Sequence, residues 1–180
     1  MTKISRRSLM AAMATAGATA LCRDDAGAAG RPEVLSQADR KAAVAKLLDY
    51  FRGTAPKLLQ PEQGLFKYPS ISPTLPGAAY NGQLWDWDTL WTTMGLFSIA
   101  KHLGDRDLHG KICEHAKGSL LNFFDHQSDE GRIPIMMMAR FVDPFGCLKK
   151  ASPNKANQAK PVMAQLGLLV ANHLHLLEPA

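Results

Sequence analysis

The chain has 180 residues, a length that indicates one domain, and its 46% hydrophobic and 21% charged residues are ordinary for a globular protein. Its formal net charge of +5 is small, and its basic residues form no cluster interleaved with aromatic ones. This distribution argues against a nucleic-acid partner.

The first residues carry the pattern of an export signal. Residues 5–10, SRRSLM, contain paired arginines, and an alanine-rich, mildly apolar run follows from 11 to 21. We expect residues 1–28 to be a twin-arginine signal peptide and the protein to be periplasmic or secreted. A lipid anchor at Cys22 is disfavoured because Leu21 before it is not small. No later stretch has the length of a membrane helix, so we expect no membrane association after cleavage.

The three cysteines leave the redox state open. Cys22 lies in the leader, whereas Cys113 and Cys147 could pair in an exported protein or remain as buried thiols. Because the twin-arginine route carries proteins that have already folded, the case for a structural disulfide is weaker.

Apolar residues at helical spacing predict four helices, over residues 36–52, 88–103, 105 or 107 to about 125, and about 157–177. The first opens on Ser36-Gln-Ala-Asp39, which resembles a capping box. Asp88 is expected at or near the N-cap of the second helix, and Asn157 can cap the fourth.

The two stretches between these helices, 53–84 and 126–159, are rich in proline and glycine and are predicted to be long loops. The short apolar run 133–138 could be extended. No strand-turn-strand rhythm is visible, so the predicted fold class is all-α.

All three tryptophans lie in residues 82–91, GQLWDWDTLW, with two aspartates between them. In one interpretation, Trp87 presents a flat apolar face to a pyranose and the Asp88 carboxylate accepts hydrogen bonds from two sugar hydroxyls. In the other, the tryptophans belong to the core and Asp88 only caps a helix. The chemistry of the side chains does not favour either the sugar-site or the core interpretation. A metal pair of Asp86 and Asp88 is weaker, because no histidine or further carboxylate is near.

Three short blocks resemble the six-hairpin glycosidases, the clan that contains trehalase and processing α-glucosidase I together with bacterial relatives acting on glucosides and mannosides. The blocks are WDTLWTTMGL at 87–96, GRIPI at 131–135 and NQAKP at 157–161, and they follow the family's order with helices between them. The resemblance covers residues 80–175.

This resemblance implies an α/α barrel of six helical hairpins, with a sugar site built from the long loops at one end. Trp87 and Asp88 match positions that line the pocket for the cleaved sugar, whereas Trp85 and Asp86 are expected to give support. Gln158 and Lys160 match a polar wall of that pocket. No metal or organic cofactor is implied.

The resemblance also implies inverting hydrolysis by a carboxylic acid and a carboxylate base. No segment of the chain matches the family's two catalytic blocks, so the catalytic residues are unknown. Four or five helices cannot close a barrel of twelve, since much of their apolar surface would stay in water. We expect residues 29–180 to be the N-terminal part of the barrel domain, an incomplete toroid with about two hairpins.

These expectations define two functions. In the first, the parent enzyme hydrolyses a glucoside or related α-linked sugar, and this chain is a truncated and inactive piece that retains part of the pocket for an oligosaccharide or glycoside. In the alternative, the chain is a non-catalytic helical protein of the envelope that binds carbohydrate or another protein.

Other polar and apolar side chains give weaker signals. Asp129 and Glu130 are interpreted as a solvated loop tip, and nothing singles out Asp143 in its loop. Met136–Met138 could line a site, but core filling is favoured.

The histidines do not predict a metal site. His173 and His175 stand two residues apart and do not share a helix face, and His102, His109, His115 and His126 lack ligand spacing. Cys113 and His115 likewise face apart on a helix, so a Cys–His nucleophile is not expected.

Overall fold

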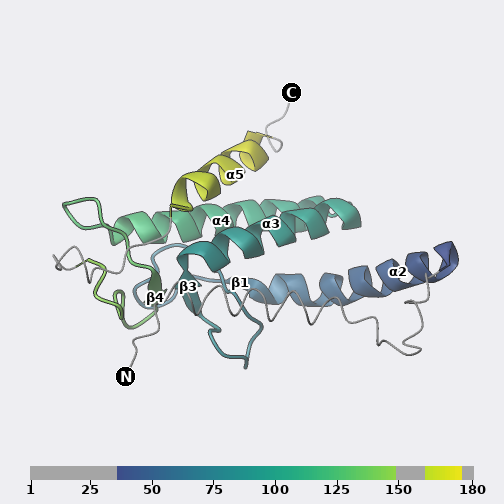
Figure 1. Cartoon of the computed structure of the whole chain (residues 1–180), viewed down its shortest axis with the longest axis horizontal. Helices are drawn as coiled ribbons and strands as arrows, with labels where there is room; N and C mark the ends of the chain where they lie inside the picture. The colour runs from purple at the N-terminus through teal and green to yellow at the C-terminus, as the bar shows by residue number, and fades with distance from the viewer. Residues whose placement is uncertain (1–35, 149–160, 176–180) are drawn as a thin grey trace, which may run out of the picture. The chain divides into compact units, whose positions relative to one another are not determined.

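A computed structural model describes residues 36–148 and 161–175 (Figure 1). These ranges are mostly helical, which confirms the all-α class, and they contain helices α2 (Gln37–Thr54), α3 (Asp86–Leu103), α4 (Arg106–Asp125) and α5 (Met163–His175). The predicted signal peptide and Asn157, Gln158 and Lys160 lie outside the described residues. The chain divides at residue 40, and residues 41–180 form one compact unit that holds the sites discussed below.

Helix α2 begins at the predicted capping box. The Ser36 hydroxyl accepts a hydrogen bond from the Asp39 amide at 3.1 Å and donates one to the Asp39 carboxylate at 2.6 Å. At the other end, the Thr54 hydroxyl donates to the Tyr50 carbonyl at 2.8 Å. A short 3-10 helix, η1 (Ala55–Leu58), follows, with proline in its first turn.

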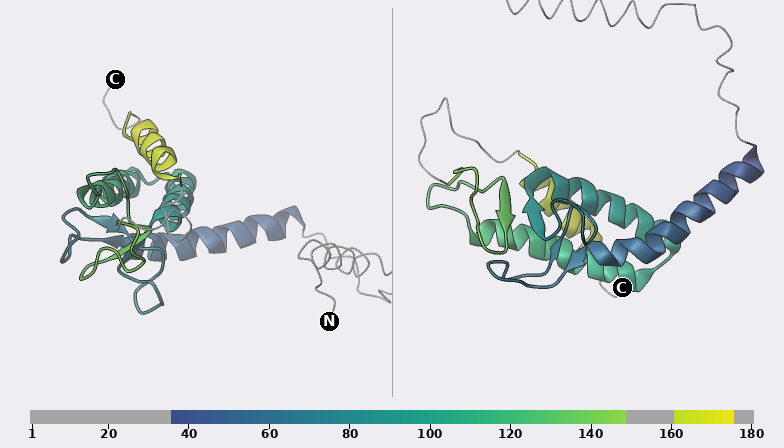
Figure 2. Two further views of the ribbon diagram at one scale, coloured as in Figure 1. Left: turned by 60° about the vertical axis from the view of Figure 1, so that its left-hand side comes forward. Right: turned by 90° about the horizontal axis from the view of Figure 1, so that it is seen from below.

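Helices α3 and α4 form an antiparallel hairpin, against which α5 packs (Figures 1 and 2). Gly104 makes the turn between them with a φ of 64°, a conformation that glycine adopts without steric cost. Asp105 caps α4 by accepting a hydrogen bond from the Leu108 amide at 2.8 Å, as the sequence predicts. The core lies between these helices and includes the fully buried Ile112 and Leu166.

Two small antiparallel sheets join the loops to the helices. Strand β1 (Leu59–Gln60) pairs with β2 (Ser70–Ile71), and β3 (Gln83–Trp85) pairs with β4 (Met136–Met138). The sequence predicts loops here and allows an extended segment at 133–138, where β4 lies. The partner strands β3 and β4 are separated by the whole α3–α4 hairpin, so no local rhythm could reveal their pairing.

Helix α4 holds the backbone of residues 69–71 with two small residues, Gly118 and Ser119. Gly118 lets the chain approach so closely that a Cβ there would lie 2.0 Å from the Pro69 carbonyl oxygen. The Ser119 hydroxyl accepts a hydrogen bond from the Ile71 amide at 2.9 Å. Because this segment leads into residues 72–82, α4 positions the loop that borders the candidate site. None of the helices in the two described ranges is both long and apolar enough to cross a membrane.

Candidate functional site

The tryptophan-rich motif lies where β3 becomes α3. Cross-strand pairing places Trp85 opposite Met136, and the Asp86 amide donates to the Ile135 carbonyl at 2.9 Å. Trp85 is therefore extended, with φ −116° and ψ 141°, and serves as the N-cap of the helix. The expected start at Asp88 is wrong, because strand pairing ends at Trp85 and Asp88 already lies in the first helical turn.

Asp86 supports the backbone of this junction. Its side chain is fully buried, and its carboxylate accepts a hydrogen bond from the Trp87 amide at 2.7 Å. A negative charge at a helix N-terminus also meets the positive end of the helix dipole. Asp86 and Asp88 stand two positions apart on α3 and do not share a face. Across the part of the chain that the structure describes, no group of three metal-ligating residues occurs.

An open cavity of about 250 Å³ lies beside the motif, and its lining consists of Pro73, Thr74, Tyr80, Trp85, Trp87 and Asp88. Trp87 is 46% exposed and Trp91 is 61% exposed. Within the described residues, these two tryptophans therefore do not belong to the core. The two residues that the resemblance assigned to sugar binding, Trp87 and Asp88, line the same cavity.

Trp85, expected to give only support, is part of the cavity wall. Its ring meets Tyr80 edge to face, with centroids 5.7 Å apart and planes at 85°, and contacts Phe145 from another loop at 5.8 Å. Its indole N–H donates to the Gln83 side chain at 2.8 Å. The aromatic wall is thus held in place by both packing and hydrogen bonding.

The loop 72–82 closes on itself and carries Tyr80 into the lining. The Ser72 hydroxyl accepts hydrogen bonds from the Gly82 amide at 3.2 Å and from the Asn81 side chain at 3.3 Å. Tyr80 has a φ of 68°, a left-handed conformation that costs a non-glycine residue free energy. Such strain is concentrated at functional sites, and here it lies at the cavity.

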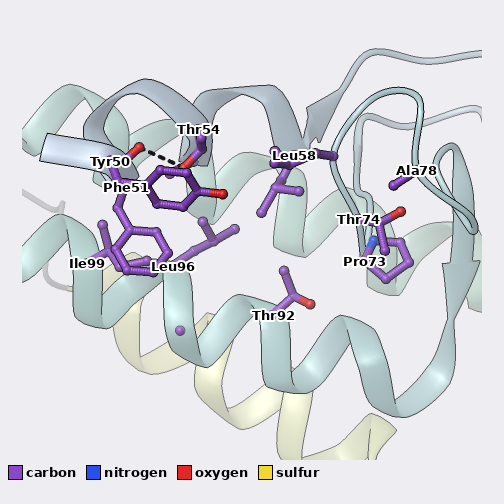
Figure 3. A pocket seen from close by; sticks show the side chains of 13 residues that line it. Tyr50, Phe51, Thr54, Leu58, Pro73, Thr74, Ala78, Thr92, Leu96 and Ile99 are labelled. Atoms are coloured by element: carbon purple, nitrogen blue, oxygen red, sulfur yellow. Dashed lines mark hydrogen bonds between the residues drawn. The ribbon is translucent and has the colours of Figure 1, made fainter. Parts of the chain in front are cut away.

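A second, larger cavity lies along α3 (Figure 3). It measures about 470 Å³ and is lined mainly by apolar side chains from the end of α2, from η1 and from the middle of α3. In Figure 3, Phe51 faces Leu96 and Ile99 of α3, while Pro73 and Thr74 stand at the other end. Those two loop residues also line the smaller cavity, so both cavities share one wall.

The weaker sequence candidates lie elsewhere. Asp129 and Glu130 are exposed, and Glu130 pairs with Arg132 at 3.2 Å, as a solvated loop tip would. The Asp143 carboxylate accepts hydrogen bonds from the Cys147 and Leu148 amides and thereby holds its own turn.

The methionine run and the cysteines belong to the interior. Met136 and Met137 are buried in β4, in agreement with core filling. Cys113 and Cys147 are both buried and do not form a disulfide with each other. Of the two possibilities left open by the sequence, the structure has the buried thiols.

One cluster was not visible in the sequence. The imidazole nitrogens His109 Nε2 and His173 Nδ1 lie 2.9 Å apart, and the His173 ring stacks on Phe97 with centroids at 3.6 Å and planes at 2°. Cys113 Sγ is 4.0 Å from His109 Nδ1, but burial raises the pKa of this thiol to about 11. The thiol therefore stays protonated at neutral pH and is a poor nucleophile.

Comparison of the chain with models of protein families, with curated proteins and with solved structures gave no match. The resemblance of three short blocks to six-hairpin glycosidases thus stays a prediction. The Asp86 amide, directly before the first of these blocks, donates to the carbonyl of Ile135 in the second.

Proposed function

We propose that the cavity beside Trp87 binds one sugar unit of a glycoside, and that the chain is part of an exported glycosidase of the six-hairpin type. The observation that carries the proposal is the joint placement of Trp87 and Asp88 in one open cavity with Tyr80 and Trp85. Trp87 and Asp88 are also the two residues of this motif that the resemblance in sequence assigns to sugar binding.

The lining suits a neutral ligand rich in hydroxyl groups. Aromatic faces offer apolar area to the C–H side of a pyranose at little cost in side-chain entropy. An ionised Asp88 is an acceptor for two vicinal hydroxyls, and such charge-assisted hydrogen bonds are about twice as strong as neutral ones. The Thr74 hydroxyl is engaged with the Ala79 carbonyl at 2.5 Å and so belongs to the loop rather than to the ligand.

Exposed apolar residues on the helices support a larger barrel. Val44 and Leu47 of α2 are each more than half exposed, and Trp91 and Met94 of α3 are exposed as well. Surfaces of this kind usually contact another element. In the proposed parent enzyme, further hairpins of the toroid cover them.

A single observation favours the second candidate, a non-catalytic carbohydrate-binding protein of the envelope. Among the described residues, Asp88 is the one carboxylate that lines the cavity, whereas inverting hydrolysis uses two with a water between them. Both candidates share the sugar site. They differ in whether a nitrophenyl glucoside is hydrolysed by the full-length gene product.

Calorimetric titration of the purified chain with glucose and trehalose tests the sugar site. Trp87→Ala should weaken binding roughly tenfold or more, because it removes most of an aromatic platform. Trp91→Ala is the matched control, since Trp91 lies on the same helix and outside the cavity. Asp88→Asn should also weaken binding about tenfold, and Asp107→Asn on α4 should not. The absence of binding to the unmodified chain, or equal loss in both tryptophan variants, refutes the proposal.

A further inference from the structure

The two cavities lie in sequence along one face of α3. Asp88, Thr92, Leu96 and Ile99 follow each other at spacings of four, four and three residues, which places them in one stripe on a helix. Asp88 lines the smaller cavity and the other three line the larger one. At a rise of 1.5 Å per residue the stripe is about 16 Å long.

The chemistry of the lining changes along this stripe. The end at Asp88 offers a carboxylate among aromatic rings, whereas the end at Ile99 is enclosed by Phe51, Leu58 and Leu96. Among the residues that the structure describes, no charged side chain lines the larger cavity. Pro73 and Thr74 belong to both linings, so the two cavities border the same loop residues.

The volumes of the two cavities indicate whether the site holds a single sugar or a larger ligand that occupies both cavities. Cavities that bind small molecules usually measure about 300–1,000 Å³ and are mostly apolar with a few polar groups. The smaller cavity, at about 250 Å³, falls below this range, and the larger one, at about 470 Å³, falls within it but has no charged group to orient a ligand. Only the two together have the volume and the chemistry of a complete site.

We propose that the ligand is an amphiphilic glycoside, with its sugar against Trp87 and Asp88 and an alkyl or aryl aglycone in the groove between α2 and α3. This inference rests on the proposed sugar site and adds the class of the aglycone. Each methylene that leaves water should strengthen binding about fourfold when fully buried. The groove is open on one side, so a chain of eight carbons should gain ~tenfold to ~hundredfold in total.

Gly95 allows the groove to be blocked without disturbing the fold. It lines the groove from the middle of α3, and a Cβ at this position would meet no atom within 4 Å. Gly95→Leu fills the space and also raises helix propensity. Gly110→Leu on α4 is the matched control, because its Cβ also has no neighbour within 4 Å and it lies outside both cavities. Ile99→Gln is a second groove variant should Gly95→Leu fold poorly.

The experiment measures tryptophan fluorescence during titration with three probes, all below their micelle concentrations. The probes are octyl glucoside, methyl glucoside of the same anomer, and the octyl ether of triethylene glycol, which has the chain but no sugar. Octyl glucoside should bind at least ~tenfold tighter than methyl glucoside. Gly95→Leu should abolish this difference without changing the Kd for methyl glucoside, and Gly110→Leu should preserve it.

The outcomes separate the two proposals. Equal affinity for the two glucosides, or a difference that survives both groove variants, overturns the aglycone site while the sugar site stands. Equal affinity for the octyl ether and octyl glucoside, with no binding of methyl glucoside, overturns the sugar site as well.

Discussion

The side-chain amide of Asn122 pairs with the backbone of Tyr68 as a neighbouring strand would. Its Oδ1 accepts a hydrogen bond from the Tyr68 amide at 3.2 Å, and its Nδ2 donates to the Tyr68 carbonyl at 2.9 Å. Asn122 is fully buried on α4. A helix therefore satisfies both backbone groups of an irregular segment that leads to the loop beside the cavity.

Asn122→Leu should destabilise the chain by about 1–3 kcal/mol, because it keeps the branched shape of the side chain but leaves two backbone groups without partners. Urea unfolding followed by circular dichroism measures the loss. Asn172→Leu, at an exposed position of α5, should change the free energy of unfolding by less than about 0.5 kcal/mol. Similar effects of the two substitutions would show that the pairing with Tyr68 contributes little.

Gly118→Ala should lower the free energy of unfolding by about 1–3 kcal/mol, because the added methyl would meet the Pro69 carbonyl at 2.0 Å and force α4 away from the loop. The same substitution at Gly110, where the Cβ has open space, should raise it by about 0.5–1 kcal/mol through helix propensity. Thermal melts of the two variants should shift in opposite directions. Parallel shifts contradict the close approach.

Stability should fall as the pH drops below about 6.5, the ordinary pKa of histidine. Burial, and next the neighbouring His109, lower the pKa of His173 in the folded chain. Between the folded and unfolded pKa the unfolded chain binds more protons, so this part of the stability is present above pH 6.5 and is lost as the pH falls through the folded pKa.

His173→Phe should flatten this dependence while keeping the stack on Phe97. Chemical denaturation at several pH values from 5 to 8 measures the slope. His102→Gln, at an exposed site of α3, is the control and should leave the slope unchanged. A slope in His173→Phe as steep as in the unmodified chain would assign the effect to other groups.

Cys113 should resist alkylation in the folded chain at pH 8, because burial raises the pKa of its thiol to about 11 and only a small fraction is thiolate. Iodoacetamide labelling followed by peptide mass mapping should show modification of Cys113 only after denaturation. Rapid labelling under native conditions would indicate that the α4–α5 contact opens readily.

The helices and several of their ends were predictable from the sequence because their signals are local. The Ser36 cap, the turn at Gly104 and the Asp105 cap each depend on residues within one helical turn. Trp87 and Asp88 were also identified locally, as unusual neighbours in the chain.

Features that depend on distant partners were missed. The start of α3 at Asp86 is fixed by strand pairing with residues 135–138, and Trp85 joined the cavity wall through contacts with Tyr80 and Phe145. His109 and His173 meet only because α5 packs against the hairpin. Their spacing in the sequence does not predict this contact.

The pairing of Trp85 with Met136 also has a consequence for the order of folding events. The two strands flank a hairpin of two long helices, and helices form faster than contacts that close long loops. The α3–α4 hairpin shortens that loop, so β3 and β4 should join after it has formed. In stopped-flow refolding, the change in tryptophan fluorescence should therefore lag behind the gain of helix. The cavity beside Trp87 should therefore be the last part of this unit to assemble and, under mild denaturation, the first part to be lost.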